Sequence, residues 1–368
     1  MSAPALSDQG PIFVHSSFRT SSTWLWSRFR RDPGVWAYCE IFHEALAALT
    51  SERAADFRYD AWNSGHPASA PYFLEFLPLL EPQGGIACYD PSMAFARFIP
   101  NGGLSGALSE GERAYVDALI ANAHRQKRRP VLADTRTLGR VKAIKSAYPS
   151  PSILLVRNLF HQWASYASQA IDGNSYFIYK TDQIIREAEH DDFSRSLGQW
   201  CGDRLAAEDN EAMFKIFLIH HLYLYAHAYD AADIIVDVNE IAGDVRKRSS
   251  KETELHDLTG MQIDLSTIDN RFTTTNLEIR DMDAFVDDVD QWVKLISSSG
   301  ASSAGLSFAE RMKNEAIAEI ESYRFYTRGL KKRSVHAIQR LRDLEASKYW
   351  RLTAPLRSVA GWFKRRAG

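Results

Sequence analysis

The chain has 368 residues, of which 45% are hydrophobic and 24% are charged, and its formal net charge is −2. These values are ordinary for a soluble globular protein, and the length suits one large α/β domain with an appendage, or two domains. Three scattered cysteines without a CxxC pair (Cys39, Cys88 and Cys201) argue against a disulfide scaffold and against a zinc site.

The sequence carries no sign of export or of membrane insertion. Its first fifteen residues lack a basic region followed by an apolar core, so no signal peptide is visible. The most apolar stretch, residues 213–228, is interrupted by one lysine and three histidines, which excludes a spanning helix there. We therefore expect a cytoplasmic protein.

Four short, apolar and β-branched runs predict buried parallel strands, with helical patterns between them. They are residues 12–14, 130–133, 152–156 and 234–238. Strands that alternate with helices predict an α/β fold, in which a central parallel sheet with right-handed crossovers is flanked by helices. In such sheets, ligands bind beyond the carboxyl ends of the strands.

The chain around these strands changes in character twice. Residues 63–110 are rich in Pro and Gly and predict an irregular lid or insertion. The serine-rich residues 297–306 predict a flexible linker, which divides an α/β domain over 1–296 from a helical, basic extension over 307–368. Residues 310–368 hold 15 Lys/Arg and 6 Asp/Glu, a net charge of +9 that leaves −11 for the rest.

The first predicted strand runs into a polar stretch, FRTSST at residues 18–23, and then into a helical start. Such a junction presents free backbone N–H groups, and the helix dipole favours a phosphate or a sulfate there. Ser21, Ser22 and Thr23 can add hydroxyl donors, and Arg19 adds a permanent cation. The absence of a Gly-Lys-Ser/Thr ending argues against an ordinary nucleoside-triphosphatase loop. The alternative is a simple N-cap, for which Ser and Thr are common.

A second junction of this kind follows the third predicted strand. The run SILLVRNLFHQWASYASQ places Arg157 at the end of the strand and Ser165 eight residues later on the next helix. The two are slightly over two helical turns apart, so both side chains could converge on one phosphate. The alternative is a structural salt bridge for the arginine and a packing role for the serine.

Together these elements resemble the nucleotide-sulfate-dependent sulfotransferases. Members carry after their first strand a turn of the type (Pro/Gly)-(Lys/Arg)-(Ser/Thr)-Gly-(Ser/Thr)-(Ser/Thr)-(Trp/Phe)-Leu, and this chain has FRTSSTWL at residues 18–25. They also carry a strand that ends in Arg, with a Ser eight residues further on. The likeness covers roughly residues 11–245, but Ser21 replaces the usual glycine and Leu159 replaces a proline. The missing C-terminal Gly-x-x-Gly-x-x-Lys pattern points to the branch that acts on carbohydrates.

The resemblance implies a single P-loop-like domain that binds 3′-phosphoadenosine 5′-phosphosulfate (PAPS) as donor, without a metal. The first turn would cradle the 5′-phosphosulfate, and the second element would bind the 3′-phosphate. Trp24 would lie near the adenine, where an aromatic face can stack, although a core position is the alternative. The implied donor-binding residues are Arg19, Thr20, Ser21, Ser22, Thr23, Trp24, Arg157 and Ser165.

Sulfuryl transfer also needs a base for the acceptor hydroxyl and a cation for the leaving phosphate. Arg19 is suited to the second task. For the first, residues 35–46 offer Glu40, His43 and Glu44. A glutamate in a comparable place often serves in carbohydrate sulfotransferases, so the resemblance implies Glu40 first and His43 second. For all three, a solvated or partly buried structural role is the alternative.

Some other polar residues are weaker candidates. Asp134, Arg136 and Arg140 follow the second predicted strand, where either arginine could meet a phosphate, although a structural salt bridge is favoured. The adjacent His220 and His221 point about 100° apart on a helix, which makes them a poor metal pair. We interpret these two as core or surface residues.

The C-terminal region predicts a long helix over residues 307–346, with alternating charges and an apolar stripe typical of a solvated or coiled-coil helix. Residues 347–368 mix aromatic and apolar side chains with Lys and Arg, which suits a membrane interface. The same ending resembles those of many bacterial enzymes of cell-surface polysaccharides. The alternative is a tail that packs on its own body or on a second copy, as in a homo-oligomer.

We therefore expect a bacterial sulfotransferase, cytoplasmic and peripheral to the inner membrane. It would move the sulfuryl group from PAPS to a hydroxyl of a saccharide or glycolipid acceptor. No nucleic-acid partner is expected. The alternatives are a non-catalytic nucleotide-binding scaffold of a polysaccharide assembly system and a P-loop kinase, against which the missing loop lysine argues.

Overall fold

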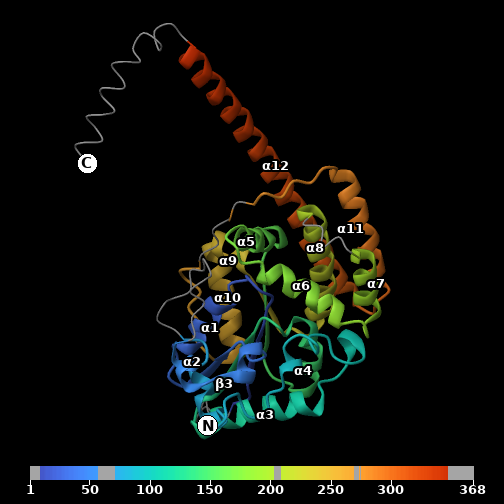
Figure 1. The fold of residues 1–368 in the computed structure, drawn as a ribbon. Helices are drawn as coiled ribbons and strands as arrows, with labels where there is room; N and C mark the ends of the chain where they lie inside the picture. The colour runs from blue at the N-terminus through green and yellow to red at the C-terminus, as the bar shows by residue number, and fades with distance from the viewer. Residues whose placement is uncertain (1–8, 57–70, 203–208, 269–272, 274, 347–368) are drawn as a thin grey trace, which may run out of the picture. The chain divides into compact units, whose positions relative to one another are not determined.

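The computed structural model describes residues 9–56, 71–202, 209–268, 273 and 275–346. The chain forms two compact units, Met1–Ala316 and Ile317–Gly368. The first unit contains a five-stranded parallel sheet and every residue predicted for the site (Figure 1).

The sheet has the strand order β2-β3-β1-β4-β5, and every neighbouring pair is parallel. The four predicted strands are confirmed, and β2 is a fifth that the sequence analysis did not identify. All five consist almost entirely of buried residues, as expected when helices cover both faces. The strands are β1 (Ile12–His15), β2 (Val35–Cys39), β3 (Arg129–Asp134), β4 (Ser152–Val156) and β5 (Ile234–Asp237).

Helices connect the strands and pack on the two sides of the sheet, with α1 and α10 on one side and α4 and α8 on the other (Figure 1). In the first unit the described α-helices are α1 (Ser22–Arg30), α2 (Ser51–Asp56), α3 (Glu110–Arg125), α4 (Val141–Ala147), α5 (Leu159–Ile171), α6 (Tyr176–Glu187), α7 (Asp192–Cys201), α8 (Asn210–Ala228), α9 (Val238–Gly243), α10 (Val245–Thr259) and α11 (Met282–Ser297). The last helix, α12 (Ser303–Ala346), begins in this unit.

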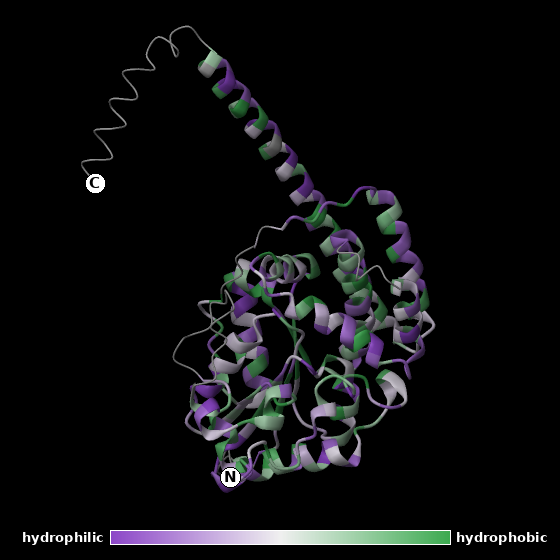
Figure 2. Ribbon diagram, viewed as in Figure 1, coloured by the Kyte–Doolittle hydropathy of each residue, from purple (hydrophilic) through white to green (hydrophobic). Residues whose placement is uncertain are grey.

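The core forms where apolar helix faces meet the strands (Figure 2). Trp26 of α1 shows how this packing is fixed: its ring is fully buried, and its Nε1–H donates to the Ala37 carbonyl of β2 at 2.8 Å. Burial of a side chain this large contributes roughly 2–3 kcal/mol to folding. The hydrogen bond satisfies its one polar atom and fixes the orientation of α1 on the sheet.

The irregular and helical segments agree with the sequence pattern in part. Of the predicted insertion over 63–110, residues 63–70 lie outside the described part. Residues 71–109 form three 3₁₀ helices, η3 (Leu74–Leu79), η4 (Pro91–Met93) and η5 (Gly103–Ser105), and one isolated antiparallel bridge between Leu80 and Ile86, as expected for an irregular insertion. The predicted long helix over 307–346 is confirmed by α12. The linker at 297–306 stays a prediction; residues 298–302 connect α11 to α12, and the compact units divide after Ala316.

The order of the strands determines where a ligand can bind. The crossover from β1 leads to β2 on one side, and the crossover from β3 leads to β4 on the other. Crossovers that leave neighbouring strands in opposite directions open a crevice at their carboxyl ends. The topology therefore predicts a crevice between the ends of β1 and β3, where His15 is paired with Asp134. Among the described helices, none is long and apolar enough to cross a bilayer.

Candidate functional site

The turn that follows β1, residues 16–21, is called the β1 turn below. Its backbone is left-handed at two residues, Arg19 (φ 62°) and Ser21 (φ 67°), while Thr20 between them is not. Ser21 occupies the position at which the sulfotransferases have glycine, and it adopts the conformation that glycine tolerates best. Left-handed residues in a turn of this kind can direct backbone N–H groups toward a bound anion.

Helix α1 begins at the β1 turn with an open N-terminus. Its first hydrogen bond runs from the Leu25 N–H to the Ser21 carbonyl at 3.2 Å, so the preceding N–H groups have no partner inside the helix. Ser21 is the N-cap residue, but its side chain makes no capping bond, so the simple N-cap interpretation is wrong at this position. The N-caps of α4 and α6 make none either, whereas seven helices are capped by Ser109, Asn158, Asp191, Asp209, Asp237, Asp244 and Asp281.

Arg19 projects from this turn toward α5 and α6. Its Nε–H donates to the Ser165 hydroxyl at 2.8 Å, and its guanidinium lies 5.6 Å from the centre of the Phe177 ring. Within the described residues, no carboxylate forms an ion pair with it. Burial lowers the pKa of Arg19 below its usual value, which indicates that the charged form is poorly solvated. A cation in such surroundings is stabilised by a bound anion.

Arg157 and Ser165 lie beside Arg19. Arg157 follows the last residue of β4 directly, as predicted, and one of its terminal nitrogens donates to the Arg19 carbonyl at 3.1 Å. Ser165 lies within α5 and is buried. The structure therefore brings both residues to the β1 turn. Their convergence on one phosphate stays a prediction.

A chain of hydrogen bonds from α5 and α8 also holds the β1 turn, and the sequence did not predict it. Gln162 of α5 donates its Nε2–H groups to the Ser17 hydroxyl at 3.0 Å and to the Phe18 carbonyl at 2.7 Å. The Ser17 hydroxyl lies 2.8 Å from His221 Nε2, and His221 Nδ1 lies 2.8 Å from the Phe217 carbonyl.

The partners in this chain determine the direction of each bond. A carbonyl only accepts, so His221 Nδ1 carries the proton and Nε2 accepts from the hydroxyl of Ser17. Burial lowers the pKa of His221 to about 4, which keeps the ring neutral at neutral pH. His221 is thus a core residue, as predicted, and it has a defined polar contact with the turn.

On the other side of the crevice, Glu40 follows β2 with a left-handed backbone (φ 55°). Its carboxylate accepts from the Thr135 hydroxyl at 2.7 Å and from the Arg136 guanidinium. Burial raises the pKa of Glu40 to about 7, and the negative charge of nearby Asp134 adds to this, against the opposing effect of Arg136. A carboxyl group with a pKa near neutrality can take up and release a proton at physiological pH.

Arg136, which follows β3, links Glu40 to a second carboxylate. Its other terminal nitrogen donates to Glu44 Oε2 at 2.7 Å, and the Tyr176 hydroxyl donates to Glu44 Oε1 at 2.6 Å. Burial alone would raise the pKa of Glu44, but Arg136, His43 and the Tyr176 hydrogen bond outweigh it and lower the pKa to about 2. Glu44 therefore stays charged and paired, whereas Glu40 is close to its titration point.

His43 is buried, and its ring is fixed by the backbone of the 3₁₀ helix η2 (Glu44–Ala48). Its Nδ1 accepts the Ala45 N–H at 3.0 Å, so the proton of the neutral ring is on Nε2. Burial lowers the pKa of His43 well below its usual value, with Arg136 adding to the effect. In this tautomer His43 donates from Nε2, and the geometry favours Glu40 over His43 as a base.

Several of the other predicted residues make contacts that stabilise the fold. Trp24 packs partly buried against the core, with the Arg28 guanidinium 5.4 Å from its ring centre. The predicted structural salt bridge is confirmed for Arg140, which donates to Glu112 at 2.8 Å, and for Arg136. Asp134 is buried and accepts the Phe42 N–H at 2.6 Å.

The two sides of the crevice meet at Phe18. The Arg136 guanidinium lies 5.2 Å from the centre of the Phe18 ring, and the ring itself packs against Tyr176 and Phe177. One aromatic residue of the β1 turn therefore contacts the Glu40–Arg136 cluster, while the next residue, Arg19, faces α5. The β1 turn and the cluster form one continuous site along the carboxyl ends of β2, β3, β1 and β4.

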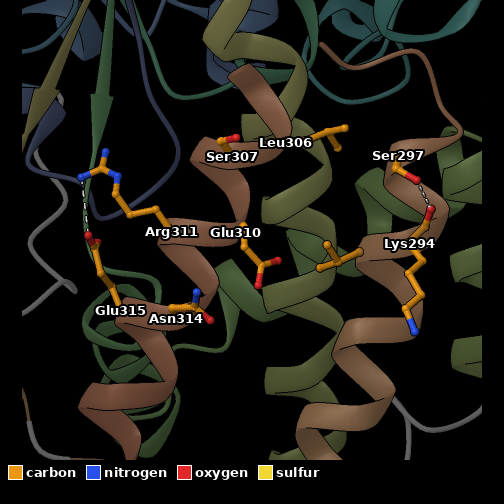
Figure 3. A pocket seen from close by; sticks show the side chains of 9 residues that line it. Lys294, Ser297, Leu306, Ser307, Glu310, Arg311, Asn314 and Glu315 are labelled. Atoms are coloured by element: carbon orange, nitrogen blue, oxygen red, sulfur yellow. Dashed lines mark hydrogen bonds and ion pairs between the residues drawn. The ribbon is translucent and has the colours of Figure 1, made fainter. Parts of the chain in front are cut away.

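A separate groove of about 710 Å³ lies between α11 and the first turns of α12 (Figure 3). It contains none of the predicted site residues, and its charged side chains include Lys294, Glu310 and the Arg311–Glu315 pair. Within the described ranges, no three His, Cys, Asp or Glu side chains are grouped so that they could hold a metal ion.

Comparisons of the chain with protein-family models, with curated proteins and with solved structures found no match.

Proposed function

We propose that this chain is a sulfotransferase that uses PAPS as donor and a saccharide hydroxyl as acceptor. The observation that carries the proposal is Arg19: a poorly solvated cation beside an open helix N-terminus, with no ion-pair partner among the described carboxylates. The family resemblance of the β1 turn and of the Arg157–Ser165 element implies that this anion would be a nucleotide phosphosulfate.

The residues of the β1 turn fit an anion of this kind. In this proposal the N–H groups at the start of α1 and the Ser22 and Thr23 hydroxyls would donate to the anion, and Arg19 would supply a fixed positive charge. Arg157 and Ser165 would hold the 3′-phosphate next to it. Bound PAPS would supply the sulfuryl group, and its 5′-phosphate would be the leaving group. Arg19 would stabilise the negative charge that develops on this phosphate.

Glu40 is the base in this proposal. It would take the proton of the acceptor hydroxyl as the new S–O bond forms and the bond to the leaving phosphate breaks. Its pKa of about 7 suits a group that must accept a proton at neutral pH, and Thr135 and Arg136 hold its carboxylate in place. The acceptor would be part of a surface glycan or its lipid-linked precursor, reached at the cytoplasmic face of the inner membrane.

The decisive experiment is a calorimetric titration of the full chain with 3′-phosphoadenosine 5′-phosphate and, separately, with ATP–Mg²⁺. We expect the bisphosphate to bind more tightly than ATP, and Arg19→Met and Arg157→Ala to weaken it at least about tenfold, the loss expected for one charge-assisted contact. Arg195→Met, which removes an exposed arginine paired with Asp192 on α7, serves as the control and should bind normally.

The other outcomes separate the alternatives. No binding of the bisphosphate by the wild-type chain contradicts the proposal. Tighter binding of ATP–Mg²⁺ favours a kinase. Binding of the bisphosphate without transfer of labelled sulfate to any cell-envelope glycan favours a nucleotide-binding scaffold.

A further inference from the structure

The second compact unit contains a helical segment with an unusual surface, residues 323–344 of α12, called the C-terminal helix below. None of its described residues is buried. Large apolar side chains that are more than two-fifths exposed nevertheless recur along it. They are Phe325, Tyr326, Leu330, Val335, Ile338, Leu341 and Leu344.

Most of these apolar residues share one face of the helix. At 100° per residue, Tyr326, Leu330, Ile338, Leu341 and Leu344 fall within about 120° of the helix surface, the width of an apolar stripe that normally faces a core. Figure 2 shows hydrophobic and hydrophilic residues alternating along α12, as such a stripe requires. Phe325 and Val335 lie on the opposite side.

Cations border this stripe and cover the opposite side. The C-terminal helix contains seven Lys/Arg and one acidic residue, Asp343. By the same angular count, Arg333 and Arg340 lie along one edge of the stripe and Arg324 and Arg342 along the other. None of these four arginines forms an ion pair with a carboxylate in the described part of the chain. These four positive charges are therefore available to an external anionic surface.

The charge and the apolar stripe together decide among three surfaces that could cover this helix. A second copy of this helix would bring another seven positive charges against the first, and like charges on facing helices repel. An anionic bilayer attracts each Lys or Arg near its surface and accepts the apolar stripe between the headgroups and acyl chains. A nucleic acid would match the charge but would leave the leucines in water.

We infer that the C-terminal helix lies in the interface of an anionic membrane, with its apolar stripe inserted and its arginines at the level of the headgroups. This inference does not depend on the sulfotransferase proposal. It concerns described residues, whereas the membrane contact predicted from residues 347–368 lies outside the part that the structure describes.

Co-sedimentation of the full chain with vesicles tests this inference. We expect binding to vesicles of phosphatidylcholine and phosphatidylglycerol at 7:3, little binding to phosphatidylcholine alone, and weaker binding as salt is raised. A variant that carries Leu330→Ser, Leu341→Ser and Leu344→Ser should bind the anionic vesicles at least about tenfold more weakly. The double variant Phe325→Ser/Val335→Ser, which removes exposed apolar side chains from the other side, should bind as wild type does.

Four results would overturn the inference. They are no binding to anionic vesicles at low salt, equal loss in both variants, normal binding of the triple variant combined with loss on deletion of residues 347–368, and a concentration-dependent dimer that only the triple variant abolishes. Circular dichroism of each variant establishes that the helix is still formed, and a triple variant that has lost helix is replaced by Leu330→Ala/Leu341→Ala, which preserves helix propensity.

Discussion

Two arginines on opposite sides of the crevice, Arg136 fully buried and Arg19 partly buried, have opposite electrostatic surroundings. Arg136, after β3, is fully buried between the carboxylates of Glu40 and Glu44 and also reaches the Tyr176 hydroxyl. Arg19, in the β1 turn, has a serine hydroxyl and an aromatic ring in place of described carboxylates. The first arginine is neutralised by the protein itself, and the second has capacity for an external anion.

The difference distinguishes an arginine with a structural role, Arg136, from one whose charge could serve an external anion, Arg19. A buried charge is tolerated when the fold provides its partner, because the attraction offsets the loss of hydration. A charge that the fold leaves without a carboxylate is costly for stability, and such costs concentrate at sites that bind ligands. Three of the six described non-glycine residues with positive φ (Arg19, Ser21 and Glu40) lie at the same site, which agrees with that view.

Replacing each arginine by methionine is the strongest test of the comparison. Arg136→Met would leave Glu40 and Glu44 without their shared partner, and we expect it to lower the free energy of unfolding by about 3–5 kcal/mol. Arg19→Met removes a poorly solvated charge and should change the free energy of unfolding by less than about 1 kcal/mol. Urea denaturation followed by circular dichroism measures both. If Arg19→Met is as destabilising as Arg136→Met, the distinction between the two arginines is wrong.

The pH dependence of transfer gives the next largest effect. As a base Glu40 must be deprotonated, so the rate should rise about tenfold per pH unit below its pKa of about 7 and level off above it. Glu40→Gln should lower the rate by about a hundredfold, abolish this step and leave binding of 3′-phosphoadenosine 5′-phosphate unchanged.

The matched control for Glu40 is Glu44→Gln, which also removes one carboxylate from Arg136. Because the pKa of Glu44 is about 2, this variant should retain the step near pH 7. Stability provides a second readout: a folded-state pKa raised from 4.5 to about 7 favours the protonated form of Glu40. The stabilisation that the folded state gains from protonated Glu40 is therefore complete below pH 4.5 and is lost as the pH rises to about 7. A step that persists in Glu40→Gln and disappears in Glu44→Gln would reverse the assignment.

His221 provides the smallest effect and shows how firmly the turn is held. In His221→Phe the Ser17 hydroxyl loses its acceptor, which costs about 1 kcal/mol, and we expect roughly fivefold weaker binding of the bisphosphate. His221→Gln, whose side-chain oxygen can accept, should recover much of the affinity. The neighbouring His220 has no hydrogen-bond partner among the described residues, so His220→Phe should leave binding unchanged. Equal effects of the two phenylalanine variants on affinity would exclude a specific contact by His221.

The sequence predicted those features that local pattern encodes. Four strands were identified because each is a short apolar run, and Arg157 and Ser165 were found because a fixed spacing on a strand and a helix carries them. Strand β2 was missed because its residues, VWAYC, continue without a turn signal into the apolar stretch around Ile41 and Phe42. Its place at the edge of the sheet is set by pairing with β3, about ninety residues further along the chain.

The tertiary contacts of the site could not be predicted in the same way. Ser17 and His221 are 204 positions apart, and Glu40 and Arg136 are 96 apart, so no periodicity relates them. The tautomer of His43 likewise depends on one backbone N–H in a 3₁₀ helix that has no sequence signature. The chemistry expected of the site predicted which types of residue it needs, but only the folded structure shows which of these residues are in contact.

The hydrogen bonds that α5 and α8 make to the β1 turn have a consequence for the kinetics of binding. Left-handed backbone at Arg19 and Ser21 costs about 1–2 kcal/mol per residue, and the fold bears this cost before any ligand arrives. A turn that is already in its final shape loses little conformational entropy when an anion binds. We therefore expect association with a charged nucleotide to be limited by diffusional encounter and not by rearrangement of the turn, with dissociation governing the affinity.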